Sequence, residues 1–303
     1  MMLRFSQIQN RMGRLLVLLI PYLWMLVFFL LPFLILVRIS FSETRIGLPP
    51  YTEVFEWLGG LAFEIKGSLV NYHFLFSDNL YLAAYANSIK IAAISTLICL
   101  IIGYPMALGI SRVKGQVRTF LLMLVILPFW TSFLIRVYAW IGLLKNEGLI
   151  NHVLQWVGLI DHPLPLLHST FAVYLGISYS YLPFMVLPLY ATLEKMDPAL
   201  LEAAADLGAK PMQAFLRVTL PQSLPGIIAG SMLVFIPSIG EFVIPDLLGG
   251  TDTLMIGKVL WNEFFLNRDW PLASSVAVIM LIILVVPLVW WQRHQQKLED
   301  QSQ

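Results

Sequence analysis

The chain has 303 residues, of which 58% are hydrophobic and 12% are charged, and its mean hydropathy is +0.78. This composition excludes an ordinary water-soluble globular protein. The 19 lysines and arginines nearly balance 18 acidic residues, so no broad basic surface exists to hold nucleic acid. A single cysteine, Cys99, excludes intramolecular disulfides and cysteine-rich zinc sites, and the five histidines form no HExxH motif. We therefore expect no metal site and no cofactor in this chain.

Long apolar segments are the main feature of the sequence. About 20 apolar residues cross the hydrocarbon core of a bilayer, because each helical residue rises 1.5 Å. Six segments reach this length and predict an all-α membrane protein with one domain over 1–303. The first resembles a signal sequence, but it is longer than a signal core and lacks a small-residue cleavage site, so we expect an uncleaved span. The predicted spans cover about 15–37, 82–110, 119–144, 169–193, 224–248 and 272–291.

Lysines and arginines in the connecting segments predict the orientation of the spans. Eleven of them lie in segments on the same side as the N-terminus, and six lie on the other side. Positively charged residues are retained in the cytoplasm, so both termini are expected to be cytoplasmic.

The inner segment between the fourth and fifth spans, about 194–222, has the pattern of a small helical hairpin. Asp197 is a typical capping residue for a first helix, and Gly208 is typical of a helix end. Pro211 suits the first turn of a second helix, because its missing N–H has no partner there. A cytoplasmic hairpin of this kind predicts either docking onto another protein or a simple connection.

This hairpin resembles the EAA loop of permease subunits of ATP-binding-cassette importers. The matching residues are Glu202, Ala203, Ala204, Gly208, Leu220 and Pro221. The resemblance implies a type I importer permease in which these residues couple the membrane helices to an ATPase. It also implies that Glu202 contacts the ATPase and that Gly208 sets the turn.

Longer stretches resemble the permease subunit of bacterial putrescine and spermidine importers. They cover residues 126–146, 230–250 and 261–271, while residues 49–57 look most like the putrescine-importer version. The resemblance implies a multi-pass subunit of the bacterial inner membrane that is not an enzyme. It further implies a second, different permease subunit, two ATPase subunits that hold ATP and magnesium, and a periplasmic polyamine-binding protein. It leaves open the choice between putrescine and spermidine.

The residues themselves offer no nucleotide-hydrolysing site. Gly257 and Lys258 lack the upstream glycine of a phosphate-binding loop, and Val259 stands where a serine or threonine is needed. No GxSxG nucleophile motif occurs either. ATP hydrolysis must therefore take place on a partner, and this chain opens and closes a path.

Three ionisable residues fall within the predicted spans, namely Lys90, Arg136 and Glu241. Such residues are costly in a membrane and mark pathways or pair with one another. Helical rise places Glu241 and Arg136 at similar depth in the outer half of the bilayer. Two interpretations remain: Glu241 pairs with Arg136 or Lys90, or it receives an ammonium group of the substrate.

A polar stripe on the fourth span joins Tyr174, Ser178 and Tyr181 at helical spacing. The stripe either lines the path or bonds to neighbouring helices, and Trp140 on the third span is a further candidate for the path. Aromatic rings suit an alkyl diamine, because they cover methylenes and attract ammonium groups. Small residues at Gly226 and Gly230 predict close helix packing.

Two other classes of function fit part of the pattern. A stand-alone secondary carrier or channel for small cations fits six spans with intramembrane charges, but it leaves the hairpin at 194–222 unexplained. A membrane-embedded enzyme is disfavoured, because no metal-ligand cluster and no nucleophile–base pair is recognisable. A permease subunit should co-purify with an ATPase and be inert without it, which distinguishes it from both.

Overall fold

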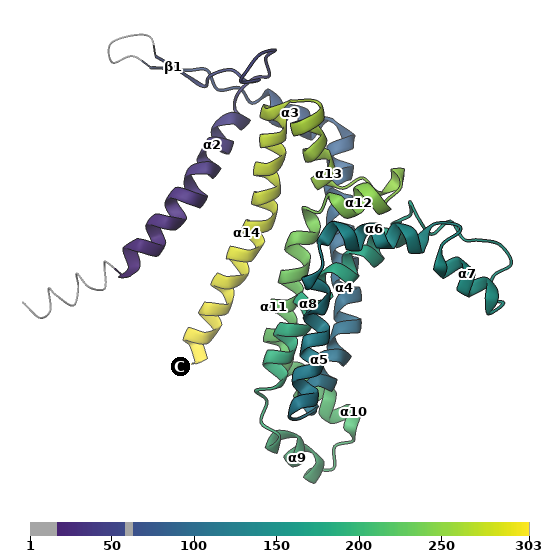
Figure 1. The fold of residues 1–303 in the computed structure, drawn as a ribbon. Coiled ribbons are helices and arrows are strands. Elements are labelled where there is room, and N and C mark those ends of the chain that lie inside the picture. The colour runs from purple at the N-terminus through teal and green to yellow at the C-terminus, as the bar shows by residue number, and fades with distance from the viewer. Residues whose placement is uncertain (1–16, 58–62, 303) are drawn as a thin grey trace, which may run out of the picture. The chain divides into compact units, whose positions relative to one another are not determined.

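The computed structural model describes residues 17–57 and 63–302 of the chain, nearly all of its elements being helices (Figure 1). Two three-residue strands form an antiparallel pair, with Glu56 opposite Glu64. The arginines at positions 4, 11 and 14, used above for orientation, lie outside the described residues. The elements are η1 (Leu26–Leu30), α2 (Leu31–Ser40), β1 (Phe55–Trp57), β2 (Phe63–Ile65), α3 (Val70–Ser77), α4 (Asn79–Arg112), α5 (Gln116–Ile126), η2 (Leu127–Trp130), α6 (Phe133–Leu144), α7 (Leu149–Trp156), α8 (Thr170–Leu193), α9 (Ala199–Asp206), α10 (Pro211–Ala214), η3 (Phe215–Thr219), α11 (Leu220–Ile239), α12 (Val243–Leu248), η4 (Thr251–Thr253), α13 (Ile256–Trp261), η5 (Asn262–Leu266) and α14 (Trp270–Ser302).

Internal contacts divide the chain into two compact units, Met1–Asp78 with Leu260–Gln303, and Asn79–Val259. The division shows which segments contact one another, but it does not show that either unit folds independently. The expectation of a single domain therefore stays a prediction.

In the first unit, α2 packs against α14 through a polar contact at one end. Ser275 Oγ donates to the carbonyl of Ser40 over 3.0 Å, and Asn71 Nδ2 donates to the same oxygen over 3.1 Å. The last turn of α2 is therefore tied to α14 and α3, although half of the side chains of α2 are exposed. Such an apolar exposed surface is what a helix next to lipid or another membrane subunit presents.

The second unit is built on α4, α8 and α11, which pack closely against one another. The core between them contains Cys99, Met185, Leu189 and Val234. Gly230 allows the close approach of α11 to α8, because a Cβ there would lie 2.9 Å from Met185 Sδ. The predicted close packing of this small-residue patch agrees with these contacts.

The membrane-length helices account for five of the six predicted spans, and the sixth depends on a bent pair of helices. Among the described residues, five helices are long and apolar enough to cross a membrane, or six if one bent pair counts as a span. The five are Val17–Ser40, Asn79–Arg112, Thr170–Leu193, Pro211–Ile239 and Trp270–Val289.

The third predicted span, 119–144, is wrong as a straight helix. The segments Gln116–Trp130 and Phe133–Trp156 meet at an angle of 90°. Thr131 and Ser132 break the helix, since their ψ angles are 150° and 137° and lie outside the helical region. Helical rise therefore does not give the depth of residues after the break.

The fifth predicted span, 224–248, is also wrong as one helix. The helix ends at Ile239, and the separate short helix α12 begins at Val243. Gly240 ends α11, and Glu241 lies in the break between the two helices. Glu241 thus stands where backbone N–H groups are free to bond.

The segment between α8 and α11 forms two helices separated by a turn. The Asp197 carboxylate accepts from the N–H of Ala199 over 2.9 Å, although the N-cap residue of α9 is Pro198, one residue later than predicted. Gly208 follows α9 with φ at +79°, a conformation that favours glycine. The second helix runs from α10 through η3 into α11.

Candidate functional site

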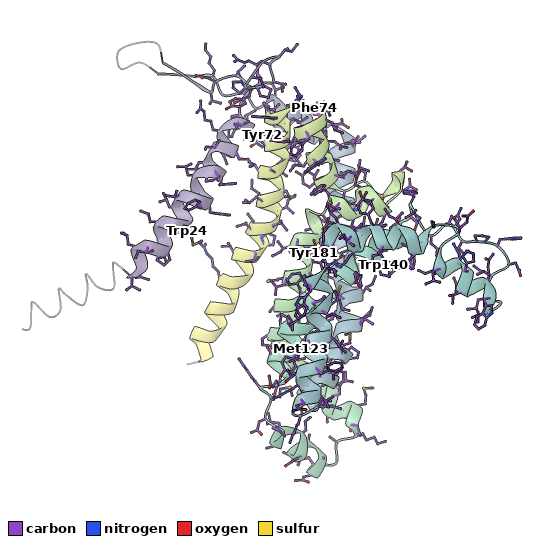
Figure 2. All side chains as sticks on the ribbon, in the orientation of Figure 1. Trp24, Tyr72, Phe74, Met123, Trp140 and Tyr181 are labelled. Carbon is purple, nitrogen blue, oxygen red and sulfur yellow. The ribbon has the colours of Figure 1, made fainter. Side chains whose placement is uncertain are left out.

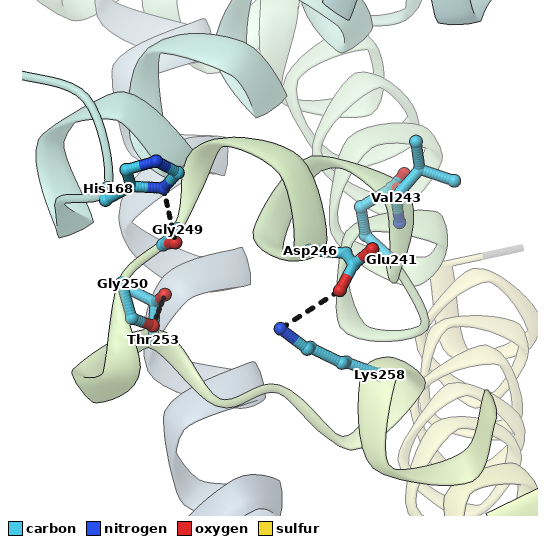
Figure 3. A network of polar contacts seen from close by, with 8 residues as sticks. All are labelled: His168, Glu241, Val243, Asp246, Gly249, Gly250, Thr253 and Lys258. Atoms are coloured by element: carbon cyan, nitrogen blue, oxygen red, sulfur yellow. Dashed lines mark hydrogen bonds and ion pairs between the residues drawn. The ribbon is translucent and has the colours of Figure 1, made fainter. Parts of the chain in front are cut away.

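Glu241 is held by three hydrogen-bond donors at the break between α11 and α12. Its Oε2 accepts from the hydroxyl of Tyr181 over 2.6 Å, and its Oε1 accepts from the backbone N–H groups of Val243 and Ile244 over 3.1 and 3.4 Å. Figure 3 shows Glu241 beside Val243 and near the ion pair that joins Asp246 to Lys258 over 3.0 Å. The carboxylate therefore caps the N-terminus of α12, where the helix dipole favours a negative charge.

A cavity of about 430 Å³ opens beside this carboxylate. Five of its eleven lining residues are aromatic, and the wall comes from η2, α6, α8, α11, the break after α11 and the start of α12. The lining residues are Phe129, Phe133, Arg136, Ser180, Tyr181, Phe184, Pro237, Gly240, Glu241, Phe242 and Val243.

Arg136 lies in the same cavity but not in an ion pair. Its guanidinium carbon is 5.2 Å from the ring centre of Phe129 and 5.8 Å from that of Phe133. Its Nε and Nη1 are buried and have no hydrogen-bond partner among the described residues. Within that part of the chain, no salt bridge of 4.0 Å or less joins Arg136 to Glu241, so the pairing interpretation does not hold for this conformation.

Lys90 lies elsewhere. Its side chain is exposed on α4 and does not line the cavity beside Glu241. Arg136 and Glu241 therefore share a cavity as expected from their similar depth, whereas Lys90 does not join them in this conformation.

The polar stripe on α8 divides between two cavities. Tyr181 bonds to Glu241, whereas Tyr174 and Ser178 line a second, apolar cavity of about 350 Å³ together with Trp140. Trp140 makes an edge contact with Tyr179 at a centroid distance of 5.4 Å. Figure 2 labels Trp140, which lies on α6, and Tyr181, which lies on α8. The candidate path residues therefore do not form one lining.

The hairpin residues predicted to couple to an ATPase lie away from both cavities. Glu202 and Ala203 are exposed on α9, Ala204 on the same helix is half-buried, and Gly208 is exposed in the turn. Leu220 and Pro221 begin α11. This surface is open to a partner, and its role stays a prediction.

Two features of the site were missed by the sequence analysis. One is the capping role of Glu241, which the run Gly240–Glu241 followed by apolar residues could have indicated as a helix end and a new start. The other is the set of rings from Phe133, Phe184 and Phe242, which local pattern could not assign to a common cavity.

The cavity beside Glu241 combines one carboxylate with several aromatic faces. Such a site suits an organic cation, because the carboxylate accepts charge-assisted hydrogen bonds and the rings attract cations and cover methylenes. No group of three or more histidine, cysteine, aspartate or glutamate side chains that could hold a metal ion occurs among the described residues.

Several helices of membrane length define a multi-pass membrane protein, in which a buried carboxylate lies at the break between α11 and α12. The chain belongs to the family described as binding-protein-dependent transport system inner membrane component, whose model matches residues 80–299.

Curated relatives match over most of this chain. The spermidine/putrescine transport system permease protein PotB of Haemophilus influenzae is 40% identical over 279 residues, covering 92% of this chain and 93% of that protein. PotB of Escherichia coli K12 is 40% identical over 270 residues, covering 89% of this chain and 93% of that protein.

Solved structures share the fold at low sequence identity. A bacterial ABC transporter involved in the import of the acidic polysaccharide alginate matches with a TM-score of 0.70 and 19% identity, covering 97% of this chain and 99% of that chain. The same kind of transporter in complex with an alginate pentasaccharide-bound periplasmic protein matches with a TM-score of 0.69 and 18% identity, covering 97% of each chain. A fold shared with an importer of an acidic polysaccharide does not determine the cargo, which depends on the residues of the site.

Proposed function

We propose that this chain is a transmembrane permease subunit of an ATP-driven polyamine importer that takes up putrescine, spermidine or both. The identity to PotB supports the cargo, and the family match supports a component of the inner membrane with several spans. The chain forms part of the translocation path by alternating access and does not itself hydrolyse ATP.

The observation that carries the proposal is the cavity beside Glu241. A polyamine has ammonium groups separated by methylenes, so it needs both acceptors and apolar cover along its path. Glu241 supplies the acceptor, while Phe129, Phe133 and Phe184 supply the cover. We assign to Glu241 the transient binding of one ammonium group.

Arg136 makes this binding weak enough for release. Its guanidinium already lies against Phe129 and Phe133, so an incoming ammonium group competes with it for these rings. Two cations in one cavity of low polarity also repel each other. A carrier benefits from this arrangement, because the cargo must leave the site on every cycle.

The hairpin at 194–222 is assigned to coupling. Glu202 and Ala203 are exposed on α9, and α10 leads through η3 directly into α11, which carries the break at Glu241. We propose that closure of an ATPase pair moves this hairpin and that α11 transmits the motion to the cavity. Two ATPase subunits, a second and different permease subunit and a periplasmic polyamine-binding protein complete the proposed assembly.

Reconstitution of the assembly tests the proposal. The chain, expressed with its permease and ATPase partners and reconstituted in proteoliposomes, should show ATP hydrolysis stimulated by the loaded binding protein. Putrescine and spermidine are compared with a neutral diol of matched length. Equal stimulation by the diol would contradict the polyamine assignment. Transport by the purified chain alone, without an ATPase, would favour a secondary carrier.

A further inference from the structure

The carboxylate of Glu241 has little hydrogen-bonding capacity left. A carboxylate offers about four lone-pair positions, two on each oxygen. The N–H groups of Val243 and Ile244 take both positions on Oε1, and the hydroxyl of Tyr181 takes one on Oε2. About one acceptor position, on Oε2, therefore remains for a further donor.

Arg136 has the opposite shortage. Its side chain lines the same cavity as Glu241, and the two residues are only 9% and 7% exposed. The Nε and Nη1 atoms of Arg136 are buried without an acceptor among the described residues. Buried guanidinium donors without acceptors are costly, and a carboxylate is the strongest acceptor that they could find. The separation of these two side chains therefore needs a physical cause.

The hydroxyl of Tyr181 supplies that cause. A guanidinium group presents its N–H groups in side-by-side pairs, which need two acceptor positions for a strong ion pair. While the hydroxyl occupies Oε2, Glu241 has only one such position. An ammonium group is a compact charge on which a single N–H can use that position, so the site suits an ammonium group better than the fork of an arginine.

We propose that Tyr181 is a positioning residue that keeps Glu241 from pairing with Arg136. Its hydroxyl leaves the carboxylate one acceptor position for an ammonium group of the cargo, and not two for the internal guanidinium. Without the hydroxyl, the guanidinium leaves the rings of Phe129 and Phe133 for Glu241 and neutralises the site. The effect on transport rests on the polyamine import proposed above, whereas the pairing itself does not.

Tyr181→Phe isolates the hydroxyl, because the ring has contacts of its own. The ring centre of Tyr181 lies 6.1 Å from that of Phe184, which lies 5.2 Å from that of Phe129, and phenylalanine keeps this wall. Tyr104→Phe is the matched control. The hydroxyl of Tyr104 shares a hydrogen bond of 2.9 Å with Ser223 Oγ between α4 and α11, and Tyr104 does not line the cavity.

A double-mutant cycle between Arg136→Gln and Glu241→Gln tests the pairing, with the thermal midpoint of the assembled complex as the readout. The cycle is run in the unsubstituted chain, in Tyr181→Phe and in Tyr104→Phe. We expect the departure from additivity to grow by several degrees in Tyr181→Phe alone, because a direct pair couples the two positions. A tyrosine that only ties α8 to the break after α11 would lower the midpoint without this coupling. An unchanged departure in Tyr181→Phe would therefore overturn the proposal.

Uptake by proteoliposomes of the assembled complex gives a second readout. Tyr181→Phe should reduce uptake of putrescine and spermidine about tenfold, because the cargo must displace a cation held by charge-assisted hydrogen bonds. In an Arg136→Gln background, the same substitution should change uptake by less than about twofold. An equal loss in both backgrounds would also overturn the proposal.

Two provisions keep the outcomes distinct. Should Tyr181→Phe fail to assemble, Tyr181→Met, which fills the space with a flexible apolar side chain and no donor, carries the same expectations. New coupling between Arg136 and Glu241, together with no uptake of either polyamine by the unsubstituted complex, would support the positioning role and contradict the proposed cargo.

Discussion

At the scale of single residues, Glu241 has three hydrogen-bond donors around it, and a substitution that keeps its shape tests the role of its charge. Glu241→Gln keeps an oxygen that accepts from the N–H groups of Val243 and Ile244, its amide NH2 can donate to the Tyr181 hydroxyl, and the negative charge is removed. A charge-assisted hydrogen bond to an ammonium group contributes about 1.5–3 kcal/mol, so polyamine uptake should fall about tenfold or more. Thermal stability of the complex should change little, because the shape of the cap is kept.

The control for Glu241→Gln is Asp246→Asn on the neighbouring helix. Asp246 pairs with Lys258 outside the cavity, and half of its side chain is exposed. Pairs of this kind contribute little, so uptake should stay within about twofold. A large loss of stability in Glu241→Gln that Arg136→Gln repairs would instead favour a permanent pair between Glu241 and Arg136.

At the scale of elements, the turn after α9 gives the second prediction. Gly208 has φ at +79°, and no neighbouring atom lies within 4 Å of the place that a Cβ would take, so Gly208→Val acts through backbone strain and not through a clash. The left-handed conformation costs a β-branched residue about 1–2 kcal/mol, which should displace α9. We expect the complex to assemble but to lose most of the ATPase stimulation by loaded binding protein.

Two further variants isolate the coupling role of the turn. Gly208→Asn should retain stimulation, because asparagine tolerates the left-handed conformation. Gly158→Val introduces comparable strain at φ of +75° in the segment after α7, away from the hairpin, and should leave stimulation intact. Normal transport by Gly208→Val would show that the turn does not position a coupling helix.

The contact between α8 and α11 gives the third prediction. A Cβ at Gly226 would lie 2.6 Å from Thr192 Oγ1 and 3.0 Å from the carbonyl of Pro188, so Gly226→Val must push the helices apart. Overpacking of this kind destabilises by about 1–3 kcal/mol. The thermal midpoint of the detergent-solubilised complex should therefore fall by several degrees. Gly109→Val on α4 has open space, and its midpoint should fall much less.

At the scale of the whole molecule, the positions of α9 and the loop after α7 relative to the membrane are the fourth prediction. Leu207→Cys lies next to the hairpin turn, and Asp161→Cys lies in the loop that follows α7; both positions are exposed. With both termini cytoplasmic, a membrane-impermeant thiol reagent should label Asp161→Cys in intact spheroplasts. Leu207→Cys should be labelled only after the membrane is permeabilised. Labelling in the reverse order would invert the topology, while Cys99 is buried and stays silent.

Local sequence pattern predicted the elements better than their directions. The helix of about 169–193 was predicted almost to the residue, because Ser169 caps it and its apolar run is uninterrupted by charge. The bend after Trp130 was missed, because a 26-residue apolar segment has the same hydropathy pattern whether its helix is straight or broken. The end of α11 was missed for the same reason, although Gly240 stood at the break.

The sequence by itself determined the class of protein. Run length and hydropathy require membrane spans, because unpaired backbone groups are too costly in hydrocarbon for any other arrangement of these segments. The resemblance of the segment at 194–222 to the EAA loop implied a permease that depends on an ATPase elsewhere, and this dependence stays a proposal.

Only the tertiary structure decided which residues share a cavity. Glu241, Tyr181 and Arg136 come from three different elements, and two breaks in the helices bring them together. Tyr174 and Trp140, which lie on the same two helices as Tyr181 and Arg136, line another cavity. Helical spacing assigns residues to a face of one helix, whereas a site depends on how several helices end and turn, and those angles result from packing between segments far apart in the chain.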